Sequence, residues 1–428
     1  MSFPHRFALV FASASLGLLG CASGGSPADG GADAGVTDLG ATDAGATDLG
    51  GPDVPVVPQD VPTDAGGATV LTAALTGRQV VPTAYASTAS GTVTFTLSPD
   101  RSLLSYTITH TILLPTSTRL YLGLAGGAGT MLLALTNNGG TTIGTTGLTP
   151  DQAQAILEGR TYVSIASSAF PDGELRGQVV QPGEVVYTAR LSADLDGRGN
   201  AGAPGGVAEI LVDAAASRLR FAVHTAGLVT VPMQAHIHTG SAGNDGPVVI
   251  DLAPVGVPFA ADFLGTRTLT PANLADLESG RLYVNVHTMG DREIRGQILR
   301  PGERLYFARL SGSEEVPPVT TPAGATLGLI VSAERDRVTY LGEVTGLMPT
   351  AAHLHAGAPG AVGDVVTPLV LMGNFLRGSA ALTATGDAGV PLLTGLAAGT
   401  IYANVHTAMY PMGEIRGQVR VVPAPSSP

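Results

Sequence analysis

The sequence contains no lysine, no tryptophan and only one cysteine among its 428 residues. A single cysteine excludes a framework of internal disulfides and a cysteine-based zinc module. The 22 basic residues are all arginine, and against 34 acidic residues they leave a formal net charge of −12. Because the chain is acidic and has no basic run, it lacks the positive patch of a nucleic-acid-binding protein, and we expect no nucleic-acid partner.

Glycine and proline, in contrast, are abundant, with 58 and 30 residues. They follow no Gly-X-Y period, which excludes collagen and favours β structure rich in turns together with some low-complexity chain. The length by itself indicates two to four domains.

Residues 1–21 have the pattern of an export signal. The apolar run at 7–20 is too short to span a bilayer, which needs about 20 residues, but it fits the apolar part of a secretory signal. Its end, Leu-Leu-Gly followed by Cys21, resembles the lipobox of bacterial lipoproteins. The resemblance implies cleavage before Cys21, lipidation of that cysteine, and a protein exported across the inner membrane and anchored by lipid to the outer membrane or cell surface. An ordinary signal peptide is the alternative.

Residues 22–68 are predicted to be a disordered linker. The segment contains eight aspartates and no basic residue, repeats Ala, Gly, Thr and Asp, and becomes proline-rich near its end. Such a composition buries too little apolar surface to offset the entropy of ordering the chain. We expect it to hold the folded part away from a membrane.

Three repeats follow the linker. The motif Gly-Glu-Leu-Arg-Gly-Gln at 173–178 recurs with small changes at 293–297 and 413–418, at spacings of 119 and 121 residues. Constant spacing near the common domain size predicts three tandem domains. We place module 1 at 69–183, module 2 at 184–302 and module 3 at 303–423.

Within each module, apolar residues alternate with polar ones, as at 219–223 and 338–344. Short alternating runs between Gly, Pro and Asp turns predict an all-β fold of three antiparallel, Greek-key-like β-sandwiches. One short helix is expected in each module before the last strand. Thr149-Pro150 and Thr270-Pro271 have the pattern of an N-cap followed by proline, whereas module 3 lacks this start.

Two modules share three further motifs in the same order. Module 2 has Ala-His-Ile-His-Thr-Gly at 235–240, Asn-Val-His-Thr at 285–288 and Glu-Ile-Arg-Gly-Gln at 293–297, and module 3 repeats all three. Together they resemble the CHRD domain, a family named after chordin. The family is extracellular, and it includes a secreted antagonist of growth factors and exported bacterial proteins of largely unassigned role. The resemblance implies β-rich extracytoplasmic modules and supplies no activity. The partners we consider are the membrane, through the lipid anchor, and an extracellular protein or matrix ligand.

Six of the nine histidines form two equivalent groups. They are His236, His238 and His287 in module 2, and His353, His355 and His406 in module 3. Residues i and i+2 of a strand project from one face about 7 Å apart, so a His-x-His pair and a third histidine from another strand can bind one ion. The pattern predicts one Cu or Zn in each of these modules with an open coordination position. The His-x-His strand is also similar to that of the copper ligands in copper/zinc superoxide dismutase.

Module 1 has none of these histidines. Aligned with module 2, it has Arg119, Tyr121 and Ala166 at the three positions. Joint loss is expected of a three-ligand unit, because a partial set binds poorly. Two other interpretations stay open, namely a hydrogen-bonded histidine cluster without metal and a general divergence of module 1.

Several neighbours of the histidines are candidates for supporting roles. Asn285 and Asn404 lie on the histidine face of their strands, which we expect to look outward or into a pocket beneath a loop. They either orient a ligand or are ordinary hydrogen-bonded strand residues. Asp245 and Asp364, in the loops after the His-x-His motifs, are either oxygen ligands or turn residues.

The acidic and basic residues of the recurring Glu-x-Arg motif are predicted to be structural, as an ion pair or a brace for the last turn, because module 1 keeps them without the histidines. These residues are Glu174, Arg176, Glu293, Arg295, Glu414 and Arg416.

The sequence favours a non-catalytic function, since no nucleophile–base pair or paired-carboxylate site recurs across the modules. The leading hypothesis is a surface lipoprotein that presents CHRD-like modules for binding, with metal in two of them. The alternatives are a copper-dependent, superoxide dismutase-like enzyme and a metal-free adhesion or matrix-binding protein.

Overall fold

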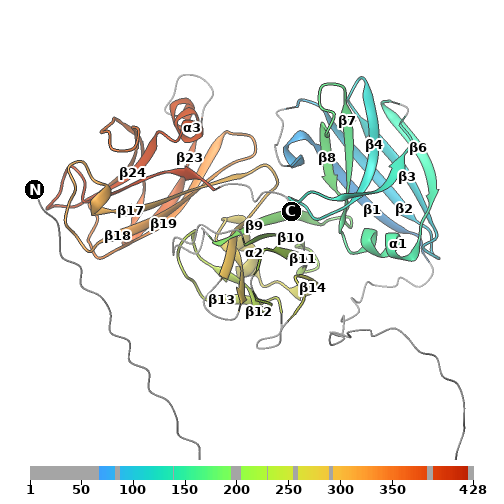
Figure 1. The fold of residues 1–428 in the computed structure, drawn as a ribbon, viewed down its shortest axis with the longest axis horizontal. Coiled ribbons are helices and arrows are strands. Elements are labelled where there is room, and N and C mark those ends of the chain that lie inside the picture. Colours follow the sequence, from blue (N-terminus) through green and yellow to red (C-terminus); the bar gives the residue numbers. More distant parts are fainter. Residues whose placement is uncertain are drawn as a thin grey trace, which may run out of the picture. The chain divides into compact units, whose positions relative to one another are not determined.

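The structure is a computed structural model that describes residues 67–81, 87–137, 139–193, 204–228, 230–253, 259–288, 293–382 and 389–422. The predicted signal at 1–21 and the predicted linker, apart from its last two residues, lie outside this part. The described residues form three antiparallel sheets, one for each repeat, with three short α-helices (Figure 1). The prediction of an all-β tandem-repeat fold is therefore confirmed.

Module 1 contains one eight-stranded sheet with the order β5-β4-β7-β8-β1-β2-β3-β6. Its elements are β1 (Thr69–Thr76), the 3-10 helix η1 (Gly77–Gln79), β2 (Ser90–Leu97), β3 (Leu103–His110), β4 (Pro115–Leu122), β5 (Thr130–Leu135), β6 (Thr141–Gly147), α1 (Pro150–Leu157), β7 (Thr161–Ser167) and β8 (Leu175–Gln178).

Module 2 repeats this order as β13-β12-β15-β16-β9-β10-β11-β14. Its elements are β9 (Val185–Ser192), β10 (Gly205–Asp213), β11 (Arg218–Ala226), β12 (Pro232–Thr239), β13 (Val248–Asp251), β14 (Asp262–Thr268), α2 (Pro271–Glu278), β15 (Leu282–Thr288) and β16 (Glu293–Leu299).

Module 3 has the order β21-β20-β24-β25-β17-β18-β19-β23-β22, and β26 pairs with β17. Its elements are β17 (Arg304–Ser311), the 3-10 helix η3 (Gly312–Glu314), β18 (Gly324–Val331), β19 (Arg337–Thr345), β20 (Ala351–Ala356), β21 (Val365–Pro368), β22 (Leu371–Met372), β23 (Phe375–Ala381), α3 (Gly389–Ala398), β24 (Ile401–His406), β25 (Ile415–Gln418) and β26 (Arg420–Val421).

Each sheet encloses its own hydrophobic core, as expected of a β-sandwich. In β2, the alternate residues Val93, Phe95 and Leu97 are buried, whereas Thr92 and Thr94, on either side of Val93, are exposed. The same period of two places apolar side chains from both halves of each sheet in one cluster per module. The alternation in the sequence therefore decides which face of each strand is internal.

A helix precedes the last strands of every module. In α1 and α2, Thr149 and Thr270 form capping boxes with the side chains of Gln152 and Asn273, and proline occupies the first turn. Module 3 has α3 without this Thr-Pro start, because packing of its apolar face stabilises the helix instead. None of the helices in the described ranges is both long and apolar enough to cross a membrane.

Candidate metal centre

The crossover in each sheet places the His-x-His strand beside the Asn-Val-His strand. In module 2, β12 pairs with β15 so that His236 lies opposite Asn285 and Gln234 lies opposite His287. In module 3, β20 pairs with β24 in the same way, and His353 lies opposite Asn404. Histidines about 50 residues apart in the sequence thus lie on adjacent strands of one sheet.

Both predicted triads come together in the structure. In each, one ring nitrogen from every histidine lies within 4.8 Å of the other two. In module 2 the ring centroid of His236 lies 5.5 Å from that of His238 and 5.4 Å from that of His287. The corresponding distances in module 3 are 5.7 and 4.9 Å. The two modules therefore present the same three-imidazole cluster.

A backbone carbonyl fixes the tautomer of the second histidine in each His-x-His pair. His238 Nδ1 lies 2.8 Å from the carbonyl oxygen of Gly246, and His355 Nδ1 lies 3.0 Å from that of Gly363. A carbonyl only accepts hydrogen bonds, so Nδ1 carries the proton and Nε2 keeps its lone pair. Both Nε2 atoms are buried and have no hydrogen-bond partner among the described residues. An unsatisfied buried acceptor is costly, and a cation is a chemically suitable partner for it.

In module 3, two of the three rings also bond to each other. His406 Nδ1 lies 3.1 Å from the carbonyl oxygen of Pro411 and therefore donates its proton there. Its Nε2 then accepts from Nδ1 of His353, at 3.0 Å. The hydrogen-bonded cluster considered in the sequence analysis is thus present for this pair, and an ion bound here has to replace that hydrogen bond.

The site favours neutral imidazoles. Burial lowers the pKa of His236, and the nearby rings of His287 and His238 lower it further. Burial likewise lowers the pKa of His353 and of His406. Neutral imidazole is the form that binds a metal ion, so the electrostatics match the geometry.

A stack of three side chains holds the second histidine. In module 2, the His238 ring lies parallel to Tyr283 at a centroid distance of 5.0 Å, and the Arg295 guanidinium lies 3.5 Å from the Tyr283 centroid on the ring face. Module 3 repeats this with Tyr402 stacked on His355 at 4.8 Å. These tyrosines were not predicted from the sequence to have a role, although a tyrosine recurs two residues before each Asn of this motif.

Module 1 keeps the stack without the histidines. Tyr121 replaces the histidine and lies parallel to Tyr162 at 5.0 Å, and Arg176 lies 3.5 Å from the Tyr162 centroid. Arg119 pairs with Ser164 in the same register that pairs His236 with Asn285 in module 2. The stack is therefore a feature of the fold, whereas at the stacked position a ring nitrogen with a lone pair occurs only in modules 2 and 3.

The arginines of the Glu-x-Arg motif brace the loop that follows the His-x-His strand. Arg295 donates to the carbonyl oxygens of Ser241 at 3.2 Å and Asn244 at 2.9 Å. Arg416 donates to that of Ala361 at 2.7 Å, and Arg176 acts in the same way on the corresponding loop of module 1.

The glutamates have other partners. Glu174 accepts from the Ser87 hydroxyl at 2.7 Å, and Glu414 accepts from Thr321 at 2.9 Å and Thr407 at 2.7 Å. The arginines of the same two motifs, Arg176 and Arg416, donate to the loop carbonyl oxygens described above. The side chain of Glu293 lies outside the described part.

Of the two loop aspartates considered as either oxygen ligands or turn residues, Asp245 faces away from the triad. Asp245 Oδ1 lies 3.4 Å from Arg295, and its side chain is 78% exposed. A carboxylate that was not predicted lies closer to the triad, since Asp251 Oδ1 is 3.7 Å from His236 Nε2. No motif marks Asp251, and only the pairing of β12 with β13 places it opposite His236.

The two asparagines are buried beside the triads. Asn285 and Asn404 are each 4% exposed and lie between the row of histidines and the bracing arginines. The Asn404 amide donates to the carbonyl oxygen of Met412 at 3.5 Å, in the loop after β24. The strand face opposite the core is therefore covered, as expected for a site beneath a loop.

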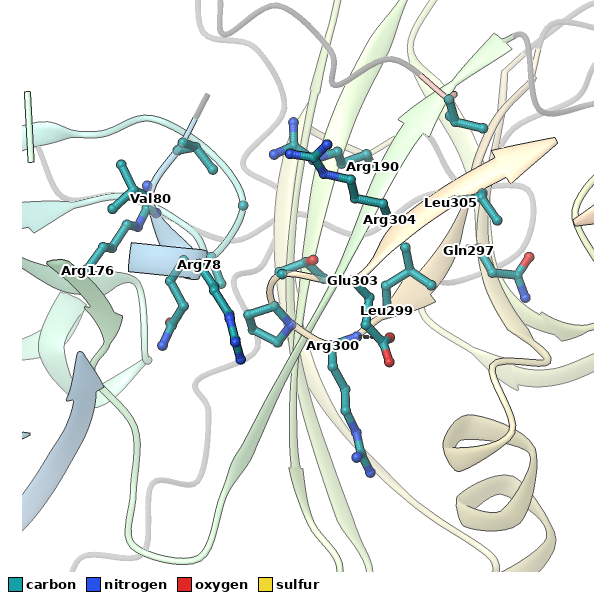
Figure 2. Close-up of a pocket in the computed structure, with 18 of the residues that line it drawn as sticks. Arg78, Val80, Arg176, Arg190, Gln297, Leu299, Arg300, Glu303, Arg304 and Leu305 are labelled. Atoms are coloured by element: carbon teal, nitrogen blue, oxygen red, sulfur yellow. Dashed lines mark hydrogen bonds between the residues drawn. The ribbon is translucent and has the colours of Figure 1, made fainter. Parts of the chain in front are cut away.

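A cavity of about 250 Å³ lies apart from the triads and has none of the six histidines in its lining (Figure 2). Arg300 and Glu303, from the turn between β16 and β17, line this cavity. The Arg300 backbone N–H donates to Glu303 Oε2 at 2.8 Å (Figure 2). The candidate metal centre does not depend on this cavity.

The fold and the site define a class of protein, namely tandem antiparallel β-sandwiches in which two of three modules carry a histidine triad. The CHRD domain profile matches residues 71–179, 187–298 and 306–419, and the chain belongs to the CHRD family. It is also similar to chordin of Danio rerio, with 34% identity over 160 residues. That match covers 34% of this chain and 17% of the chordin chain, so the matched segment spans only a small part of that relative.

Proposed function

We propose that this is an exported CHRD protein that binds one Cu or Zn ion in module 2 and one in module 3. The ligands are the two histidine triads, His236, His238 and His287, and His353, His355 and His406. The observation that carries the proposal is the buried Nε2 of His238 and of His355, which has a lone pair and no protein partner among the described residues.

The geometry suits a small divalent ion. At Zn–N distances of about 2.0–2.1 Å, nitrogens around a tetrahedral ion are about 3.4 Å apart, and the candidate nitrogens lie within 4.8 Å. Small ring rotations close this difference. Three neutral imidazoles leave one coordination position for water or another ligand, so the site also suits recognition of an extracellular ligand through the metal.

Module 1 supports the assignment as an internal comparison. It has the same strand order and the same aromatic stack, but an alanine, Ala166, occupies the third histidine position. A purely structural histidine cluster gives no reason why all three side chains differ together. We therefore expect module 1 to bind no metal.

Metal analysis of the purified full-length chain tests the proposal. After saturation with Zn²⁺ and removal of unbound ion, we expect two equivalents per chain by mass spectrometry. His238→Ala should retain one equivalent, and the double variant His238→Ala, His355→Ala should retain none. His224→Ala is the control, because His224 pairs with Asp262 away from both triads, and it should retain two. Full binding by the double variant, or none by the native chain, would refute the proposal.

Membrane anchoring is the second part of the proposal. It is supported by the lipobox-like end of the apolar run at Cys21 and by the acidic, proline-rich linker that follows. We infer that lipid on Cys21 retains the protein at a membrane surface and that the linker displays the three modules to extracellular protein or matrix ligands.

A further inference from the structure

The two triads differ at the strand that borders them. In module 2, Asp251 on β13 is the cross-strand partner of His236. Residues directly opposite each other on antiparallel strands have side chains on the same face, and Asp251 Oδ1 lies 3.7 Å from His236 Nε2. The imidazole of His236 therefore has a carboxylate at one edge.

The other edge of the same ring is directed into the protein. His236 Nδ1 is buried and has no hydrogen-bond partner among the described residues. In module 3 the corresponding Nδ1, of His353, faces the triad and lies 3.0 Å from His406 Nε2. We conclude that Nδ1 is the ligand atom at this position and that Nε2 is the edge that meets Asp251.

Module 3 has no carboxylate at this place. Pro368 is the cross-strand partner of His353, with the same β-bulge after the next pair. A proline side chain accepts no hydrogen bond. In module 1 the corresponding residue is Ala134, opposite Arg119. Among the described residues, only module 2 thus combines a histidine triad with a carboxylate beside the outer ring nitrogen.

A carboxylate behind a ligating histidine has known consequences. It accepts the proton of the second ring nitrogen, which fixes the tautomer and the ring orientation and makes the ligating nitrogen more basic. Its negative charge also attracts a divalent cation at short range. Loss of such a partner typically reduces metal affinity by about 10- to 100-fold.

We propose that Asp251 is a positioning residue that makes the module 2 site the tighter of two zinc sites, and that Pro368 leaves the module 3 site weaker and more readily exchanged. This inference rests on the proposed metal-binding function. The hydrogen bond between His353 and His406 acts in the same direction, because an ion has to displace it in module 3. The chain then has one retentive site and one exchangeable site.

Zinc affinities of single-site variants of the full chain test this inference. The variant His355→Ala keeps only the module 2 triad intact, and His238→Ala keeps only the module 3 triad. Each variant is titrated with Zn²⁺ against a chromophoric chelator. We expect the module 2 site to bind about 10- to 100-fold more tightly. Adding Asp251→Ala to the module 2 variant should remove most of this difference, whereas Asp251→Asn, which keeps a carbonyl acceptor, should retain part of it.

Further variants separate ligand positioning from folding. Asp262→Ala removes a carboxylate that pairs with a histidine outside the triads, and it should leave zinc affinity unchanged. Pro368→Asp, on the edge strand β21, should tighten the module 3 site. The visible spectrum of the Co²⁺-loaded module 2 variant should change with Asp251→Ala, while its metal-free thermal unfolding should not.

The outcomes distinguish the two proposals. If neither single-site variant binds zinc, the proposed function fails and this inference fails with it. If both bind with equal affinity, or if Asp251→Ala leaves the affinity of module 2 unchanged, the triads bind metal and the role of Asp251 alone is refuted.

Discussion

At the scale of single residues, modules 1 and 2 differ less in the shape of the stacked side chain than in whether its ring offers a nitrogen lone pair. Tyr121 and His238 occupy the same position and stack on a tyrosine at the same centroid distance of 5.0 Å. Both rings fit the flat space above the stacked tyrosine of their own module, but only the imidazole has a ring nitrogen with a lone pair. The difference at this one position thus changes the lone pairs that the ring offers and leaves the stack intact.

A buried carboxyl in module 3 makes stability depend on pH. Glu315 is 7% exposed, and burial raises its pKa to about 6 from the usual 4.5, although the charge of Arg416 opposes the shift. A raised pKa in the folded state means that its stabilising contribution is complete below about pH 4.5 and is lost as the pH rises through 6. Over this window the native protein should lose up to about 2 kcal/mol of unfolding free energy.

The variant Glu315→Gln imitates the protonated carboxyl. Its unfolding free energy, measured with urea at pH 5 and pH 8, should lack this loss. Glu314→Gln, at the exposed neighbouring position, should follow the native pH profile. Parallel profiles for native protein and Glu315→Gln would contradict this account of the carboxyl.

At the scale of elements, the loop after each His-x-His strand is held from several sides. In module 3, Gly363 accepts from His355 and its N–H donates to the Tyr402 hydroxyl at 3.2 Å, while Arg416 donates to the Ala361 carbonyl. If residue 363 had a side chain, its Cβ atom would lie 1.5 Å from the Ala356 carbonyl oxygen. The loop therefore reaches the histidine only because residue 363 is glycine.

The change Gly363→Ala should displace this loop. We expect a loss of about 1–3 kcal/mol in unfolding free energy, as is usual for overpacking, together with a fall in bound zinc from two equivalents to one. Thermal unfolding and metal analysis of the full chain measure the two effects. Val362→Ala, at the adjacent 70% exposed position, is the control and should retain both equivalents. An unchanged Gly363→Ala variant would show that the loop tolerates the side chain.

At the scale of the whole molecule, one topology occurs three times with three different sites. Module 1 has the stack alone, module 3 adds a histidine triad, and module 2 adds a triad with a neighbouring carboxylate. Because each module has its own core, a change at one site leaves the packing of the other modules intact. If the triads bind metal as proposed, tandem repetition would allow the affinity to differ from module to module within one fold.

The proposed anchor is also a property of the whole chain. Cys21→Ser removes the thiol that lipidation requires, so the protein should move from the membrane fraction to the soluble fraction and lose radiolabelled fatty acid. Zinc binding should stay at two equivalents, because the triads lie far along the chain from residue 21. Ser23→Ala is the control and should remain with membranes. Membrane retention of Cys21→Ser would exclude a lipid anchor at this residue.

Much of the fold follows from local pattern and recurrence. Alternating apolar residues predicted the strands, motif spacing predicted three modules, and Thr149 and Thr270 marked the starts of two helices. Module 3 was harder, because α3 has no such start and depends on packing. For the site, recurrence identified the six histidines, while the stacked tyrosines went unassigned because an aromatic residue in a strand is normally core.

The amino-acid sequence by itself determined the repeat, the β-sandwich class, the CHRD family and the two histidine triads, because each depends on residues that recur at constant spacing. The tertiary structure alone decided which ring nitrogen keeps its lone pair and which carboxylate lies behind His236. Both depend on strand register, since a shift of one residue would turn Asp251 to the opposite face of the sheet. Register is set by bulges, turns and core packing acting together, and no single stretch of sequence specifies it.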